Sequence, residues 1–107
     1  MYEVHVFEAE ATATVANTDV YLPGARHGVL VFSRQLVRTE HDWVQAETGL
    51  SQAGWSAVSF QRAGTLSAES LNGKSEQFAS AFEHAMLGGC GVVVYREPSR
   101  QGNTNAQ

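Results

Sequence analysis

The chain is poor in the residues that mark secreted and membrane proteins. It contains one cysteine, Cys90, so no internal disulfide can form and a reducing compartment is indicated. The apolar run Val92–Tyr95 is as long as any in the sequence, and it is far too short to span a bilayer. The first residues lack the cationic start and the apolar stretch of a signal peptide. We therefore expect a cytoplasmic protein.

Clustered positive charge is also lacking. The seven Lys and Arg residues are scattered with no two adjacent, and the net charge is −4. Nucleic-acid-binding domains usually carry a basic stripe, and anionic membrane surfaces attract clustered cations. The charge pattern argues against nucleic-acid and membrane partners alike.

Local metal-binding and catalytic motifs are missing as well. The four histidines include no pair at the i, i+2 or i, i+4 spacing that brings two nitrogens to one ion: His5, His27, His41 and His84. A lone cysteine cannot form a thiolate cluster, and no Gly-x-Ser-x-Gly elbow occurs. We predict no metal site, no cofactor and no catalytic residue.

The sequence does contain the pattern of one folded domain. Its 107 residues, 43% of them hydrophobic, suit a single modest core. Hydrophobic alternation and buried runs predict strands at 2–16, 28–38, 55–64 and 90–96. Amphipathic spacing predicts one helix between Thr39 and Gly54 and another between Ser75 and Gly88. The domain then covers residues 1–97, and the polar tail 98–107 has nothing to bury.

The predicted order, β-β-α-β-α-β, is typical of an α+β fold. We expect a single mixed or antiparallel sheet of about four strands, with both helices on one face. The segments 28–38 and 90–96 are apolar on both faces, so the face without helices would need cover from a second subunit. The apolar positions of residues 2–16 shift by one near Val6–Phe7, which predicts a bulge there.

Two constellations leave an enzyme open as an alternative. Glu8 and Glu10 share one face of the first strand and can divide acid and base work if they line a concavity. Cys90 and His84 can act as nucleophile and base if the fold brings them together. A solvated strand face and a small buried cysteine explain the same residues without chemistry.

Large aromatic residues are the remaining signal. Most belong to the predicted layer between helix and sheet, and they are expected in the core. Two tryptophans near one helix can also wall a pocket for a small apolar ligand. The candidate ligand-binding residues are therefore Trp43, Trp55, Phe60 and Phe82.

The segments LSQAGWSAVSF (50–60) and 78–95 resemble small orphan α+β proteins of mobile integron gene cassettes and small bacterial immunity proteins. The resemblance implies no site residue. We predict a non-enzymatic, acidic protein-binding or accessory domain that forms a homodimer or binds a protein partner, with the free edge of strand 2–16 as its binding surface. An apolar-ligand binder and a small enzyme are the alternatives.

Overall fold

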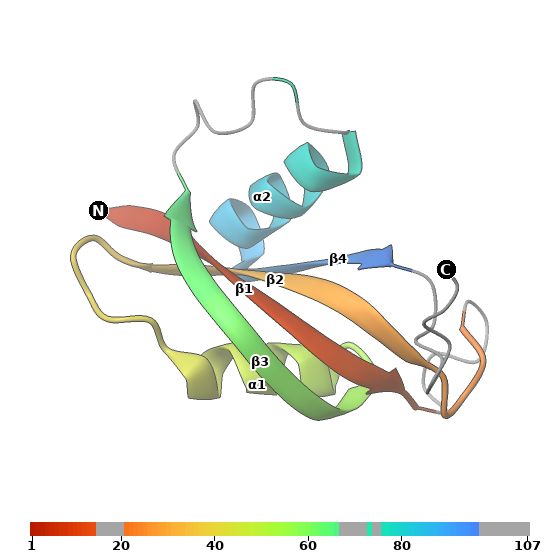
Figure 1. Ribbon diagram of the computed structural model, residues 1–107. Helices are drawn as coiled ribbons and strands as arrows, with labels where there is room; N and C mark the ends of the chain where they lie inside the picture. Colours follow the sequence, from red (N-terminus) through yellow and green to blue (C-terminus); the bar gives the residue numbers. More distant parts are fainter. Residues whose placement is uncertain (15–20, 67–72, 74–75, 97–107) are drawn as a thin grey trace.

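Figure 1 shows the computed structural model of the chain, in which residues 1–14, 21–66, 73 and 76–96 are described. The elements are β1 (Tyr2–Ala13), β2 (Arg26–Leu36), α1 (Trp43–Gln52), β3 (Trp55–Leu66), α2 (Glu76–Gly88) and β4 (Cys90–Arg96). This is the predicted α+β order. Three predictions lie outside the described residues: the tail 98–107, the end of the first strand at residue 16 and the start of the second helix at Ser75.

The four strands form one sheet in the order β3-β1-β2-β4, and every neighbouring pair is antiparallel. The prediction of a single sheet of about four strands is confirmed, in its antiparallel form. The expectation of a free edge on the first strand is wrong, because β1 pairs with β2 on one side and with β3 on the other. Within the described part of the chain, the outer strands are β3 and β4.

The two helices lie on opposite faces of the sheet (Figure 1). Successive residues of β4 show this, because neighbouring side chains of a strand point to opposite faces. Cys90 points toward α1, where a Cβ built on Gly49 would lie 2.6 Å from the cysteine Sγ. Gly91 points toward α2, where a Cβ would lie 2.3 Å from the carbonyl oxygen of Ala81. The expectation of both helices on one face is therefore wrong.

The strands that are apolar on both faces now have an explanation. A helix with one apolar stripe packs on a sheet, but the stripe does not say on which face. Both β2 and β4 contact α1 and α2, so each of these strands is covered on both sides within one chain. The need for a second subunit to cover a bare apolar face disappears.

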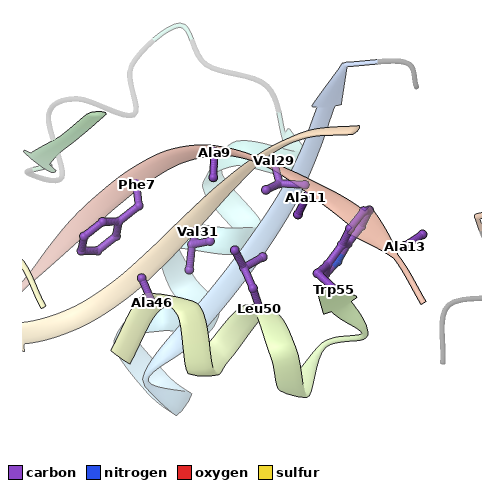
Figure 2. Close-up of a cluster of buried hydrophobic side chains, with 9 residues drawn as sticks. All are labelled: Phe7, Ala9, Ala11, Ala13, Val29, Val31, Ala46, Leu50 and Trp55. Atoms are coloured by element: carbon purple, nitrogen blue, oxygen red, sulfur yellow. The ribbon is translucent and has the colours of Figure 1, made fainter. Parts of the chain in front are cut away.

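Two buried clusters follow from this layering. The first lies between the sheet and α1, where Ala46 and Leu50 pack on β1, β2 and Trp55 (Figure 2). The second lies between the sheet and α2, where Ala81 and Ala85 pack on residues of all three strands β1, β2 and β4, namely Val4, Phe32 and Val93. The predicted stripe of the second helix is confirmed, since its remaining members also pack on this cluster: Phe78, Phe82 and Met86.

The bulge predicted near Val6–Phe7 is absent between β1 and β2, whose register runs unbroken from Tyr2 to Thr12. A change of apolar phase needs no bulge when both faces are covered. Val4 is buried under α2, whereas Phe7 is buried under α1. The register shifts lie instead between β1 and β3, at Glu8/Ala9 and Glu10/Thr12.

The ends of α1 follow their local sequence. Asp42 is the N-cap, and its carboxylate accepts a hydrogen bond from the backbone N–H of Gln45 at 2.9 Å. Gly54 follows the C-cap with a φ of 95°, a conformation that favours glycine. Among the described residues, neither helix is long and apolar enough to cross a membrane.

Candidate functional site

The structure separates the four aromatic residues predicted to bind a ligand. Trp43 and Phe60 lie together, with ring centroids 5.2 Å apart. Trp55 lies beyond the other end of α1, where its ring centroid is 5.3 Å from that of Tyr21. Phe82 belongs to α2 and packs on the buried cluster at the opposite face of the sheet. One pocket walled by all four residues is therefore not formed.

The carboxylates of Glu8 and Glu10 are each held by an arginine. Arg62 pairs with Glu8, and Arg26 Nε lies 3.6 Å from Glu10 Oε1. Arg26 also donates a hydrogen bond of 2.7 Å to the backbone oxygen of Ala57 in β3. These ion pairs link neighbouring strands across the sheet, which is a structural role.

The structure also keeps Cys90 and His84 apart. Cys90 faces α1, whereas His84 is an exposed residue of α2 on the other side of the sheet. Burial raises the pKa of the Cys90 thiol, which disfavours the nucleophilic thiolate. The arrangement does not support a cysteine–histidine pair.

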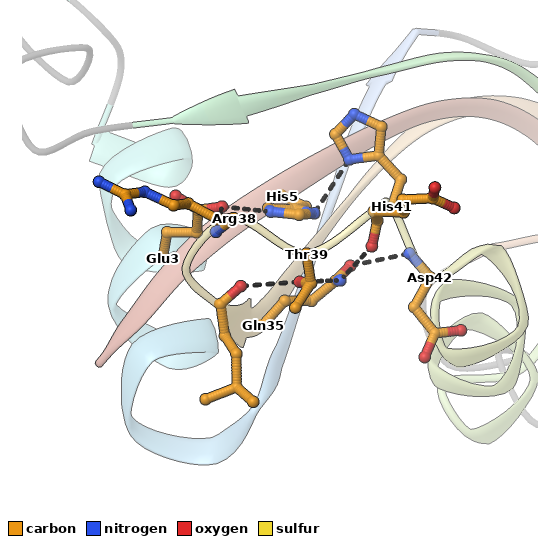
Figure 3. Close-up of polar contacts among 9 residues, drawn as sticks. Glu3, His5, Gln35, Arg38, Thr39, His41 and Asp42 are labelled. Atoms are coloured by element: carbon orange, nitrogen blue, oxygen red, sulfur yellow. Dashed lines mark hydrogen bonds and ion pairs between the residues drawn. The ribbon is translucent and has the colours of Figure 1, made fainter.

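A polar chain that the sequence analysis missed connects β1 to the loop before α1 (Figure 3). His5 is fully buried, and its Nε2 lies 2.8 Å from a carboxylate oxygen of Glu3. Its Nδ1 lies 2.9 Å from Nδ1 of His41, in the loop. Because a carboxylate accepts hydrogen bonds, Nε2 of His5 donates to Glu3. In the neutral pair, His5 Nδ1 then accepts the proton of His41 Nδ1.

The electrostatics of this chain centre on Glu3. The hydrogen bond from His5 lowers the pKa of the Glu3 carboxyl below its usual range, and the backbone N–H of Arg38 contributes at 3.3 Å from the same oxygen. Glu3 is therefore ionised at neutral pH and can stabilise a positive charge on the histidine pair.

A buried glutamine holds the loop that carries His41. The side-chain nitrogen of Gln35 donates to the Thr39 hydroxyl at 3.2 Å and to the Glu40 carbonyl at 2.8 Å. Its side-chain oxygen accepts the backbone N–H of Asp42 at 3.0 Å. The loop is thus fixed on both sides of His41, as Figure 3 shows.

The same loop borders a cavity of about 630 Å³. Its walls come from the ends of β1 and β2, the loop and the first turn of α1, and they include Tyr2, Arg34, His41 and Trp43. The Arg34 guanidinium lies 4.6 Å from the centre of the Tyr2 ring. Of the predicted ligand-binding residues, this cavity is lined by Trp43 and not by Trp55, Phe60 or Phe82, within the described part of the chain.

Comparison with family models, curated proteins and solved structures finds no match. The resemblance to cassette-borne and immunity proteins therefore stays a prediction. Within the described residues, no group of three His, Cys, Asp or Glu side chains is arranged to hold a metal ion.

The outer edge of β3 is the other feature of note. In residues 55–61 the strand is irregular, since both register shifts with β1 fall opposite this half and Ala57 has a φ of 50°. From Arg62 to Leu66 the pairing with β1 is regular. No strand pairs with the other side of this segment among the described residues. We call residues 62–66 the straight edge.

An aromatic layer lies beside the straight edge. Phe7 is the partner of Ala63 across the sheet, and its ring centroid lies 5.1 Å from that of Trp43 and 5.9 Å from that of Phe60. Trp43 remains 42% exposed although it belongs to this layer. An exposed aromatic ring thus packs on Phe7, the cross-strand partner of a residue of the straight edge.

Proposed function

We propose that this chain is a small cytoplasmic protein-interaction module that self-associates by pairing the straight edges of two copies. The observation that carries the proposal is the straight edge itself, a regular segment of β3 with no strand on its outer side among the described residues. A strand edge of this kind is a template for another strand. Proteins commonly block such edges with Lys, Pro or bulges, and the bulges of β3 lie in residues 55–61, outside the straight edge.

A second copy suits this edge. Antiparallel pairing about Gly64 places Arg62 opposite Leu66 and Ala63 opposite Thr65, so no two like charges face each other. A Cβ built on Gly64 meets no atom within 4 Å, so a side chain at this position fits without a clash. The exposed ring of Trp43 packs on Phe7, the cross-strand partner of Ala63, and offers apolar area near this segment. An interface of five strand residues and a few side chains falls in the small class that forms weak dimers.

The other predicted functions have less support. The carboxylates proposed for catalysis are engaged with arginines, and Cys90 and His84 lie on opposite sides of the sheet. Ligand binding keeps one favourable observation, the cavity of about 630 Å³ beside Trp43. A thermal-shift screen tests that second candidate, because a bound compound raises the melting temperature by mass action. Trp43→Ala should abolish any specific shift.

Sedimentation velocity over a concentration series tests self-association. We expect a reversible monomer–dimer equilibrium. Gly64→Lys should weaken the dimer, because two lysines would face each other at the two-fold axis. Gly64→Val should strengthen it, since β-branched cross-strand pairs stabilise sheets. Ser80→Lys, an exposed change on α2, makes the same charge difference and should have no such effect.

Two outcomes would contradict the proposal. One is a monomer at every concentration, for the wild-type chain and for Gly64→Val. The other is a dimer that Gly64→Lys and Ser80→Lys weaken equally, since that result would assign the effect to net charge rather than to the edge.

A further inference from the structure

The contact between His5 and His41 holds one hydrogen. Each imidazole presents its Nδ1 to the other at 2.9 Å, and the second nitrogen of His5 is already engaged with Glu3 at 2.8 Å. One of the two facing nitrogens must therefore carry a proton and the other must accept it. In the neutral pair this selects the Nε2–H form of His5 and the Nδ1–H form of His41.

A first added proton fits this arrangement. His41 can take it on Nε2 while its Nδ1 keeps donating to His5, and the ionised Glu3 stabilises the resulting charge. A second added proton does not fit. Both Nδ1 atoms would then carry hydrogen, so the bond of 2.9 Å would be replaced by facing N–H groups on two cations.

The surroundings of the His5–His41 pair supply few negative groups that could stabilise a second positive charge. The titratable group bonded to the pair is Glu3 on β1. On the loop, Arg38 is a cation, and the carboxylates of Glu40 and Asp42 flank His41 along the chain on exposed residues. The residues across the sheet from His5 are uncharged, namely Ser33 of β2 and Thr65 of β3, as is Trp43 at the start of α1. His5 itself is buried, so water does not solvate its charge.

We propose that His5 and His41 form a proton-sensitive latch that holds the aromatic layer beside the straight edge and releases it on the second protonation. His41 packs edge-to-face on Phe7, with ring centroids 5.7 Å apart, and lies 6.3 Å from Trp43. Trp43 in turn packs on Phe60 of β3. Figure 3 shows the His41 ring above His5, joined to it through the Nδ1 contact. Loss of that contact removes the bond between the His41 ring and β1, while the backbone N–H of Arg38 still bonds Glu3 and Gln35 still holds the loop backbone.

The consequence for self-association rests on the proposed function. With His41 released, Trp43 loses a neighbour that fixes its ring beside the straight edge. Acidification should then weaken the dimer by about three- to tenfold, the range given by the loss of one aromatic contact.

Nuclear magnetic resonance of the ring nitrogens tests the latch directly in the full chain. At neutral pH we expect His41 as the Nδ1–H tautomer, which is unusual for a free histidine, and His5 as the Nε2–H tautomer. On acidification the Trp43 indole N–H resonance should shift together with the second protonation. His41→Gln, whose amide can still donate to His5, should remove this shift, whereas His84→Gln on exposed α2 should leave it unchanged.

Sedimentation at pH 7 and pH 5 then tests the link to association. The dimer should weaken at pH 5 in the wild-type chain and in His84→Gln, and it should weaken less in His41→Gln. The latch would be overturned if the rings of His5 and His41 stayed in contact when both are charged. It would also be overturned if the Trp43 resonance still shifted on acidification in His41→Gln. If the Trp43 resonance of Gly64→Lys shifts on acidification as expected, but the wild-type chain forms no dimer, the proposed function is overturned and the latch is not. A dimer with equal pH dependence in wild type and His41→Gln would overturn the link alone.

Discussion

The packing of α1 on β4 predicts that the effect of Gly49→Ala on stability depends on the residue at position 90. Gly49 lies inside α1, where replacing Gly by Ala ordinarily stabilises a protein by about 1 kcal/mol. Here the added Cβ would lie 2.6 Å from Sγ of Cys90. Overpacking of a well-packed core costs about 1–3 kcal/mol. Gly49→Ala should therefore be neutral or destabilising, by up to about 2 kcal/mol.

Removal of the sulfur should reverse the result. The same added Cβ lies 3.7 Å from Cβ of Cys90, which is ordinary van der Waals contact. In a Cys90→Ala background, Gly49→Ala keeps the helix preference and loses the clash, so it should stabilise by about 1 kcal/mol. The double-mutant cycle then has a coupling free energy of about 1–3 kcal/mol.

Urea unfolding of the four proteins, followed by circular dichroism, measures this coupling. Gly88→Ala is a matched control, since a Cβ there meets no atom within 4 Å, and its effect should be the same with and without Cys90. If the changes in unfolding free energy caused by Gly49→Ala and Cys90→Ala add to within about 0.5 kcal/mol, the two residues are not in contact. That result would also refute the placement of α1 on the face opposite α2.

Other changes follow from the same structure. Gly91→Ala should destabilise far more than Gly88→Ala in urea unfolding, because its Cβ would meet backbone atoms of Ala81, and equal effects would contradict the close approach of α2. Glu3 has a lowered pKa when folded, so its contribution to stability is present above its unfolded pKa and is lost as pH falls through the folded pKa. Glu3→Gln should flatten the acid limb of a stability–pH profile, and an unchanged limb would argue against the bond to His5. The half-buried thiol of Cys90 has a raised pKa, so it should react with a thiol reagent more slowly than that of the unfolded chain at pH 8, and equal rates would contradict this partial burial.

Local patterns predicted the elements well. The stripe through Phe78 and Ala85 identified α2, and the residues after Gly89 form β4 with the predicted bounds. Such patterns depend on neighbours in the chain, which are visible in a sequence. The face that each helix covers depends on how a connection crosses the sheet, and the stripe does not record this. The best clue was the apolar character of β2 and β4 on both faces, which we had assigned to a missing subunit.

The histidine pair was out of reach for a related reason. His5 and His41 are 36 positions apart, and their contact depends on a loop held by Gln35. A search for local histidine spacings cannot find such a pair. Glu3 and His5 do share the i, i+2 spacing of one strand face, so the first half of the chain Glu3–His5–His41 was visible in the sequence. The position of His5 between Val4 and Val6 in a predicted strand was the available signal, because a polar side chain buried in such a strand needs a hydrogen-bond partner.

Amide hydrogen exchange of the straight edge tests the central claim of self-association most directly. The outward N–H groups of residues 62–66 should exchange with solvent in dilute protein and become protected as the concentration rises, while amides in the irregular half of β3 change less. Gly64→Lys should remove the concentration dependence. Exchange of residues 62–66 that is independent of concentration, in a sample that sedimentation shows to be dimeric, would contradict pairing through this edge.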